Sequence, residues 1–171
     1  MKRALDLLYG AAAWAAALFM IGTLAMIVLS IAGRLLHFHV RGTDAYAGYC
    51  MAGAAFLALA HTFKRGEHIR VTLFLERFGS GVHRALELWS HFAGLVLSGL
   101  LAWFSCRLVW QSFMFNDISQ GNDATPLWIP QLSMALGSVV FAIAMLESLV
   151  DVIQHRDPRH RAPDAEPVRS E

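Results

Sequence analysis

Four long apolar stretches, separated by polar segments, run along the chain at about 7–33, 45–63, 86–110 and 127–150. The first two contain no charged residue. A transmembrane helix needs about 20 consecutive, mostly apolar residues, and each stretch approaches or exceeds that length. The pattern therefore predicts an all-α integral membrane protein with four transmembrane helices.

The first apolar stretch follows Lys2 and Arg3, as the core of a secretory signal peptide would. It is, however, much longer than the signal-peptide core of about 7–15 residues, and Arg34 follows it in the manner of a stop-transfer flank. We therefore expect an uncleaved first transmembrane helix. A polar connection comes next, and Asp44 is a natural N-cap for the second helix.

Residues 67–78, between the second and third stretches, have a helical pattern of their own. Basic residues gather at the start of this segment, and Val71, Phe74, Leu75 and Phe78 then follow the i, i+3, i+4, i+7 spacing of one helical face. A helix of this composition lies in the membrane surface, with its basic head among the headgroups and its apolar stripe in the acyl boundary. We expect an interfacial amphipathic helix here, ended by the run 79–81, Gly-Ser-Gly.

Composition supports the membrane assignment, and charge sets the orientation. The 171 residues are 56% hydrophobic and 16% charged, whereas soluble domains carry about a quarter charged residues. A net charge of +1 gives no basis for nucleic-acid binding. Eleven of the fourteen Lys and Arg residues lie before the first stretch, between the second and third, or after the fourth. The positive-inside rule then places both termini and the amphipathic segment in the cytoplasm, with a disordered tail at 153–171.

Two histidines suggest one possible cofactor. His61 and His91 lie near the cytoplasmic ends of the second and third spans. At equal depth on neighbouring helices they would form the axial ligands of a b-type haem in a four-helix bundle, which keeps a cytochrome subunit as an alternative function. The other interpretation places both at the headgroup boundary, bonded to water or backbone. One possible pair among eight histidines is weak support for haem, so we expect no cofactor.

Three charged residues in or beside the spans are candidate structural charges: Asp44, Arg107 and Glu147. Arg107 stands close to the outer end of the third span, where its long side chain can snorkel to the interface or pair with Asp44, Asp117 or Asp123. A substrate-binding role for Arg107 is the less favoured alternative. Glu147 lies near the cytoplasmic end of the fourth span and can meet the basic segment there.

The sequence contains no recognisable catalytic site. It contains no nucleotide-binding loop, no metal-ligand cluster and no nucleophile–base pair within a membrane site, so we expect neither an enzyme nor a metal protein. No acidic residue lies deep in a span, which argues against a self-contained ion pathway. Cys50 and Cys106 are expected to be unpaired thiols in apolar surroundings.

Small or polar residues recur at helical spacing in the first three spans. Apolar helices gain nothing from hydrophobic burial against each other in lipid, so close backbone approach along such stripes drives their packing. We expect the stripes to serve mainly contacts among the four helices. They comprise Ala12, Ala16 and Gly22 in the first span, Gly48, Ala52, Ala55 and Ala58 in the second, and His91, Gly94, Ser98, Ala102 and Ser105 in the third.

The run R-G-x-H-I-R-V-T-L-F directly follows the second span, and its matching residues are Arg65, Gly66, His68, Ile69, Arg70 and Val71. In this four-span order the run resembles the small membrane subunit, DctQ type, of TRAP (tripartite ATP-independent periplasmic) transporters. Many members carry an acidic residue where this chain has Thr72. A looser match is the polar loop leading to the run 126–130, P-L-W-I-P. The resemblance covers roughly residues 5 to 152.

The resemblance implies a small, non-catalytic permease subunit of a sodium-driven, binding-protein-dependent importer of organic acids. A large multi-span permease subunit would carry substrate and sodium across the bacterial inner membrane, and a periplasmic substrate-binding protein would deliver the substrate. The small subunit would serve as scaffold and membrane anchor, with its amphipathic segment against phospholipid headgroups. A stand-alone membrane assembly protein is a further alternative.

Overall fold

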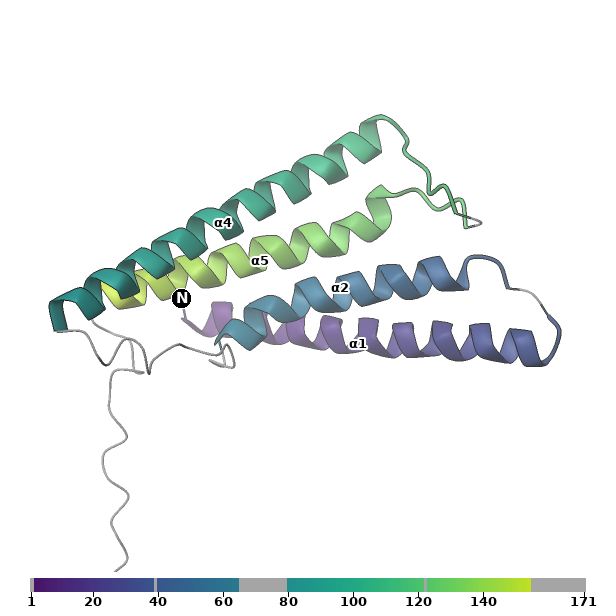
Figure 1. Cartoon of the computed structure of the whole chain (residues 1–171), viewed down its shortest axis with the longest axis horizontal. Coiled ribbons are helices and arrows are strands. Elements are labelled where there is room, and N and C mark those ends of the chain that lie inside the picture. The colour runs from purple at the N-terminus through teal and green to yellow at the C-terminus, as the bar shows by residue number, and fades with distance from the viewer. Residues whose placement is uncertain (1, 39, 65–79, 122, 155–171) are drawn as a thin grey trace, which may run out of the picture.

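The computed structural model describes residues 2–38, 40–64, 80–121 and 123–154 (Figure 1). Four helices account for most of them: α1 (Lys2–Leu35), α2 (Thr43–Lys64), α4 (Ser80–Met114) and α5 (Trp128–Ile153). The predicted all-α class is confirmed. The expected amphipathic helix at 67–78 lies outside the described residues, and so does the expected disordered tail at 153–171 except for its first two residues. Of these two, Ile153 belongs to α5.

The helices form a single layer in the order α1, α2, α5, α4 (Figure 1). Helices that follow one another in the chain run in opposite directions, so both short connections, 36–42 and 115–127, lie at one end of the layer, which we call the loop end. The neighbours α2 and α5 run parallel to each other. The start of α1, the end of α2, the start of α4 and the end of α5 lie at the opposite end, the terminal end. Helix α5 therefore separates α4 from α2.

Three of these helices are long and apolar enough to cross a membrane: α1, α4 and α5. Helix α2, which corresponds to the predicted second span, is not among them. Its sequence is rich in Ala and Gly and includes two tyrosines and His61, which lowers its hydropathy. Its place in the layer accounts for that composition, because α2 packs against α1 on one side and α5 on the other and small residues permit close approach on both.

The core among α1, α2 and α5 is built mainly from alanines. Gly53 of α2 lies between Phe19 of α1 and Ser133 of α5. Both side chains are so close that a methyl group in place of the glycine hydrogen would be crowded. Gly137 of α5 lies directly against the backbone of Phe56. The buried apolar cluster consists of Tyr9, Ala12, Ala16, Leu57, Ala60, Val140 and Ala144.

Helices α4 and α5 meet along a line of serines. Ser98, Ser105 and Ser112 are spaced seven residues apart, or about two helical turns, and all three are buried. The hydroxyl oxygen of Ser105 lies 3.4 Å from that of Ser138 on α5. Of the small-residue stripe expected in the third span, Ser98 and Ser105 are buried in this seam, and Gly94 lies against Met145 of α5. The stripe expected in the second span behaves differently, because Gly48, Ala52 and Ala55 are exposed.

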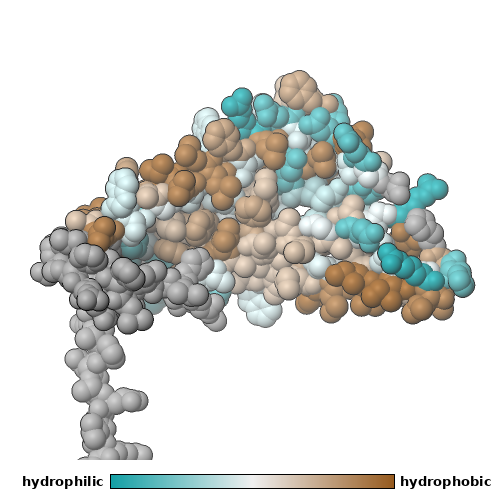
Figure 2. All heavy atoms as spheres, in the orientation of Figure 1, coloured by the Kyte–Doolittle hydropathy of each residue, from teal (hydrophilic) through white to brown (hydrophobic). Residues whose placement is uncertain are grey.

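The single layer leaves many large apolar side chains uncovered. Figure 2 shows such surface over α1 and α4. Leu24 and Val28 on α1 and Leu97, Trp103 and Phe104 on α4 are each more than half exposed. A soluble monomer rarely exposes contiguous apolar surface of this extent, whereas lipid or a membrane partner covers it without cost.

Candidate functional site

The terminal end of the layer holds a charged cluster that draws one residue from each of three helices: Tyr9 of α1, Lys64 of α2 and Glu147 of α5. The Tyr9 hydroxyl donates a hydrogen bond to Glu147 Oε2 at 2.8 Å, and Lys64 Nζ lies 2.5 Å from the same oxygen. The Lys64 ammonium also lies 5.2 Å from the centroid of the Tyr9 ring, within cation–π range. We call these three residues the terminal cluster.

The terminal cluster is largely withdrawn from solvent. Tyr9 is 4% exposed, and the side chains of Lys64 and Glu147 are 23% and 16% exposed. A charge in such a site is tolerated only when it is paired and hydrogen-bonded. The cluster therefore joins α1, α2 and α5 at the point where the chain leaves α2 for the segment 65–79.

Glu147 was expected to meet the basic residues that follow the second span. It pairs with the first of them, Lys64, at the end of α2. Tyr9 was not predicted as part of this site. The signal was present, because Tyr9, Ala12 and Ala16 share one helical face at i, i+3 and i+7. A tyrosine on a small-residue face can bury its ring only if its hydroxyl finds a partner.

The loop end carries a second polar network, the loop tie, formed by Tyr46, Tyr49, Ser119, Asp123 and Thr125. The Tyr49 hydroxyl donates to Asp123 Oδ2 at 3.0 Å, and the Ser119 hydroxyl donates to Asp123 Oδ1 at 2.8 Å. Thr125 donates through its hydroxyl to the Tyr46 oxygen at 3.1 Å. The tie fastens the connection 115–127 to the first turns of α2.

Close backbone approach completes the loop tie. Gly42 has a φ of +78°, and a Cβ there would lie 2.7 Å from the Cβ of Asp123, so only glycine fits. Within the connection, the Ser119 amide donates to the Thr125 carbonyl at 2.8 Å and the Leu127 amide donates to the Asp117 carbonyl at 2.9 Å. From sequence this connection was expected to be a polar loop, and the tie was not predicted, because nothing in the local pattern pairs the connection with α2.

Within the tie, the surroundings of the Asp123 carboxyl group shift its pKa. Desolvation raises its pKa, but the hydrogen bonds from Ser119 and Tyr49 outweigh that effect, and the pKa is lowered to about 2. Because the folded-state value lies below the usual value near 4, the carboxylate's contribution to the tie is complete above that usual value. It is lost as the pH falls through about 2.

Replacing Asp123 by asparagine is expected to loosen the loop tie at neutral pH. We expect hydrogen exchange at amides 117–127 to be severalfold faster in Asp123→Asn than in the unsubstituted chain at pH 7, and the difference to shrink as the pH falls through about 2, where the unsubstituted chain loses the Asp123 charge. Asp117→Asn is the matched control, since the Asp117 side chain is exposed and the hydrogen bonds of Asp117 within the connection are made by its backbone. Equal exchange of Asp123→Asn and the unsubstituted chain at pH 7 would contradict the assignment.

The other candidate charges lie apart from both networks. Arg107 is exposed on α4, and no ion pair joins it to Asp44, Asp117 or Asp123, so the pairing considered for it is not formed. Asp44 lies inside the first turn of α2 rather than before it, because the helix begins at Thr43. It therefore does not act as the N-cap. A carboxylate in the first turn still stabilises the helix through its favourable interaction with the helix dipole. Its Oδ1 accepts a hydrogen bond from Ser30 at 3.4 Å.

The histidine pair considered for haem is not supported by the packing. His61 lies on α2 and His91 on α4, and α5 lies between those helices, so they do not form the facing pair that axial ligation requires. Within the described residues, no group of three or more His, Cys, Asp or Glu side chains is placed to hold a metal ion. Cys50 and Cys106 are both free, as expected, and Cys50 lies against Gly22 of α1.

The residues of the expected interfacial anchor all lie outside the described part of the chain. They are Arg65, Gly66, His68, Ile69, Arg70 and Val71 of the motif, and Phe74, Leu75 and Phe78 of the apolar stripe.

These features together define an all-helical membrane component whose polar networks join helices rather than surround a reaction centre. Residues 23–155 match the family model described as tripartite ATP-independent periplasmic transporters, DctQ component. The match covers most of the chain, and the chain belongs to this family, the small membrane component of TRAP transporters. Membership implies association with a large permease subunit and a substrate-binding protein. No curated protein matches the chain.

Proposed function

We propose that the chain is the non-catalytic scaffold subunit of a sodium-driven, binding-protein-dependent importer of organic acids. In this role it anchors the large transport subunit in the bacterial inner membrane. The observation that carries the proposal is the single helix layer, whose apolar faces stay largely exposed. A layer of this kind presents a broad surface to a membrane partner and encloses no route for a solute between its own helices.

The placement of charge supports a static role. The charged residues of the described helices lie toward the helix ends, with Glu147 near one end and Arg107 nearer the other. A proton or cation pathway needs ionisable groups near the bilayer midplane, usually facing an internal cavity. The large subunit would therefore carry both substrate and sodium.

We propose further that α2 crosses the membrane as a fourth span. It lies between α1, to which it runs antiparallel, and α5, to which it runs parallel, and flanking helices of membrane length would shield its less apolar surface from lipid. The domain would then comprise residues 1–152, with the tail 153–171 and both termini in the cytoplasm. Lys64 and Arg84 at the terminal end of the layer agree with that orientation under the positive-inside rule.

Reconstitution tests the scaffold proposal directly. Liposomes that contain only this chain are expected to take up no organic acid, whereas liposomes with the large subunit and an added binding protein are expected to show sodium-dependent uptake. Robust uptake by the single chain would overturn the proposal. Recovery of the chain from membranes without any large transporter subunit would instead favour a stand-alone assembly protein.

The basic amphipathic segment is proposed as the cytoplasmic anchor of the scaffold. Each basic residue near an anionic membrane surface contributes about 1 kcal/mol, so Arg70→Glu is expected to lower the yield of the complex with the large subunit by several-fold. Arg169→Glu in the tail is the matched control and should leave the yield unchanged. Equal yields for the two variants would mean that Arg70 serves only as a topology signal.

A further inference from the structure

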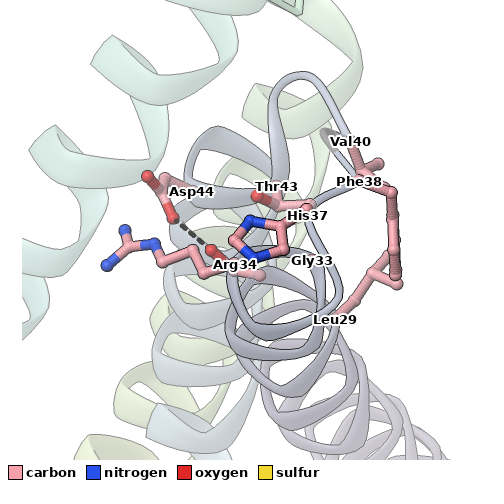
Figure 3. Close-up of a pocket in the computed structure, with 9 residues that line it drawn as sticks. Leu29, Gly33, Arg34, His37, Phe38, Val40, Thr43 and Asp44 are labelled. Carbon is pink, nitrogen blue, oxygen red and sulfur yellow. Dashed lines mark hydrogen bonds between the residues drawn. The ribbon is translucent and has the colours of Figure 1, made fainter.

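The loop end contains a cavity of about 300 Å³ between the end of α1 and the start of α2. Figure 3 shows two chemically different sides. Arg34 and Asp44 lie on one side of the His37 ring, and Leu29, Phe38 and Val40 lie on the other. None of these residues takes part in the terminal cluster or the loop tie. The cavity thus has one polar side and one apolar side.

The turn that shapes the cavity is held by specific backbone contacts. The Phe38 amide donates to the Gly33 carbonyl at 3.0 Å, which closes the end of α1. A Cβ at Gly33 would lie 2.8 Å from the Phe38 oxygen, so the chain can turn only over a glycine. His37 occupies the following left-handed position, with a φ of 54°, where glycine is the usual residue. Strained residues of this kind often mark functional sites, and His37 lines the cavity.

The polar side carries two opposite charges that do not satisfy each other. Arg34 is exposed, and no ion pair joins it to Asp44, although both line the cavity. Asp44 has one long hydrogen bond, from Ser30 at 3.4 Å. A charged group near apolar surface gains most from a partner of opposite charge. The two residues together therefore suit a ligand that carries a negative and a positive group side by side.

The apolar side of the cavity continues into surface that lipid can cover. Leu29 lines the cavity and is also part of the exposed apolar surface of α1, together with Ile21 and Val28. Figure 2 shows apolar surface of α1 reaching the loop end of the molecule. In a membrane-crossing α1, this end lies where the hydrocarbon region gives way to headgroups. An acyl chain along α1 would bring its own headgroup to the polar side of the cavity.

We propose that this cavity binds the headgroup of a phospholipid that carries a primary ammonium beside its phosphate. Arg34 and His37 contact the phosphate, and Asp44 accepts hydrogen bonds from the ammonium. A trimethylammonium headgroup is bulkier and has no N–H to donate to Asp44, and a glycerol headgroup has no positive charge. The site therefore selects phosphatidylethanolamine over phosphatidylcholine and phosphatidylglycerol. The inference does not depend on which solute the complex transports.

Lipid binding to the full chain in detergent micelles tests the proposal by native mass spectrometry. Phosphatidylethanolamine is expected to bind about tenfold more tightly than phosphatidylcholine or phosphatidylglycerol with the same acyl chains, as the loss of one charge-assisted hydrogen bond implies. Asp44→Asn should abolish that preference, whereas Arg34→Gln should weaken the binding of all three lipids, because each carries the phosphate. Arg41→Gln is the matched control, because Arg41 is exposed in the same connection and does not line the cavity. Equal binding of the three lipids, an unchanged preference in Asp44→Asn, or unchanged affinities in Arg34→Gln overturns the proposal.

Two further arms keep the test decisive. Should either charge variant fail to fold, His37→Gly replaces it, since glycine is favoured at a φ of 54° and the fold should be kept while the affinity for all three lipids falls. Unchanged lipid affinities in that variant would overturn the site. Glycerophosphoethanolamine, which has the headgroup without acyl chains, should fail to displace the bound lipid at matched concentration. Displacement would identify a soluble phosphoamine as the ligand and overturn the lipid assignment.

Discussion

Gly137→Ala is expected to destabilise the chain by about 2–3 kcal/mol, although alanine is the better helix former by about 1 kcal/mol. An ideal Cβ at this position would lie 2.5 Å from the Phe56 carbonyl carbon, 2.6 Å from its oxygen and 2.8 Å from the Leu57 nitrogen. All three are backbone atoms of α2, so no side-chain rotation relieves the overlap. The two helices must move apart instead.

The expected cost follows from what that movement disturbs. Gly53 and Ser133 lie in the same helix contact, and Leu57 and Val140 belong to the buried cluster beside it. Dispersion weakens quickly once packed surfaces separate by even a fraction of an ångström to an ångström. Helices in lipid have little other reason to associate, so the lost contacts are not replaced. We expect the transition of the purified protein in detergent, followed by helicity, to move to lower denaturant concentration.

Two glycines in the same layer provide matched controls for Gly137. A Cβ at Gly99 on α4 or at Gly48 on α2 would meet no atom within 4 Å. Gly99→Ala and Gly48→Ala should therefore leave stability unchanged or raise it by up to about 1 kcal/mol, in line with helix propensity. If all three variants shift the transition in the same direction, the α2–α5 contact is not what limits stability.

The helix positions were predictable because each depends on local sequence. Runs of apolar residues define α1, α4 and α5, and the glycine at position 42 and the polar run before Trp128 mark the connections. The order of helices in the layer was not predictable in this way. Which helix lies beside α2 depends on the shape of small-residue faces on α1 and α5 together, and a single stripe carries no information about its partner.

The partners within the two polar networks were likewise not predictable from the local sequence. Glu147 was recognisable as a charge near a helix end, and a basic partner was expected. Tyr9, however, joins the terminal cluster from 138 positions away in the chain. Tyr49 and Asp123 are likewise 74 positions apart. Each side chain looks ordinary in its own segment, so only the three-dimensional arrangement identifies these contacts.

Glu147→Gln is expected to destabilise the chain by about 2 kcal/mol, because it removes the negative charge that neutralises Lys64 in a mostly buried site. Removing one partner of a fully buried pair costs about 3–5 kcal/mol. The Lys64 and Glu147 side chains remain 23% and 16% exposed, so solvent screens part of that cost. The glutamine oxygen can still accept the hydrogen bond from Tyr9, which confines the loss mainly to the charge pair. Asp151→Asn, one turn further along α5, is the matched control and should have almost no effect.

A double-mutant cycle separates the pair from the packing around it. Lys64→Met alone removes the ammonium that pairs with Glu147 and should also be destabilising. The combination of Glu147→Gln and Lys64→Met removes both charges, so its cost should be well below the sum of the single costs, with a coupling of about 1–3 kcal/mol. If the stability costs of the two single variants simply add, the Lys64 ammonium is neutralised by another group. A coupling of the expected size would show that an ion pair joins α2 to α5 at the terminal end, where α2 leads into the proposed cytoplasmic anchor.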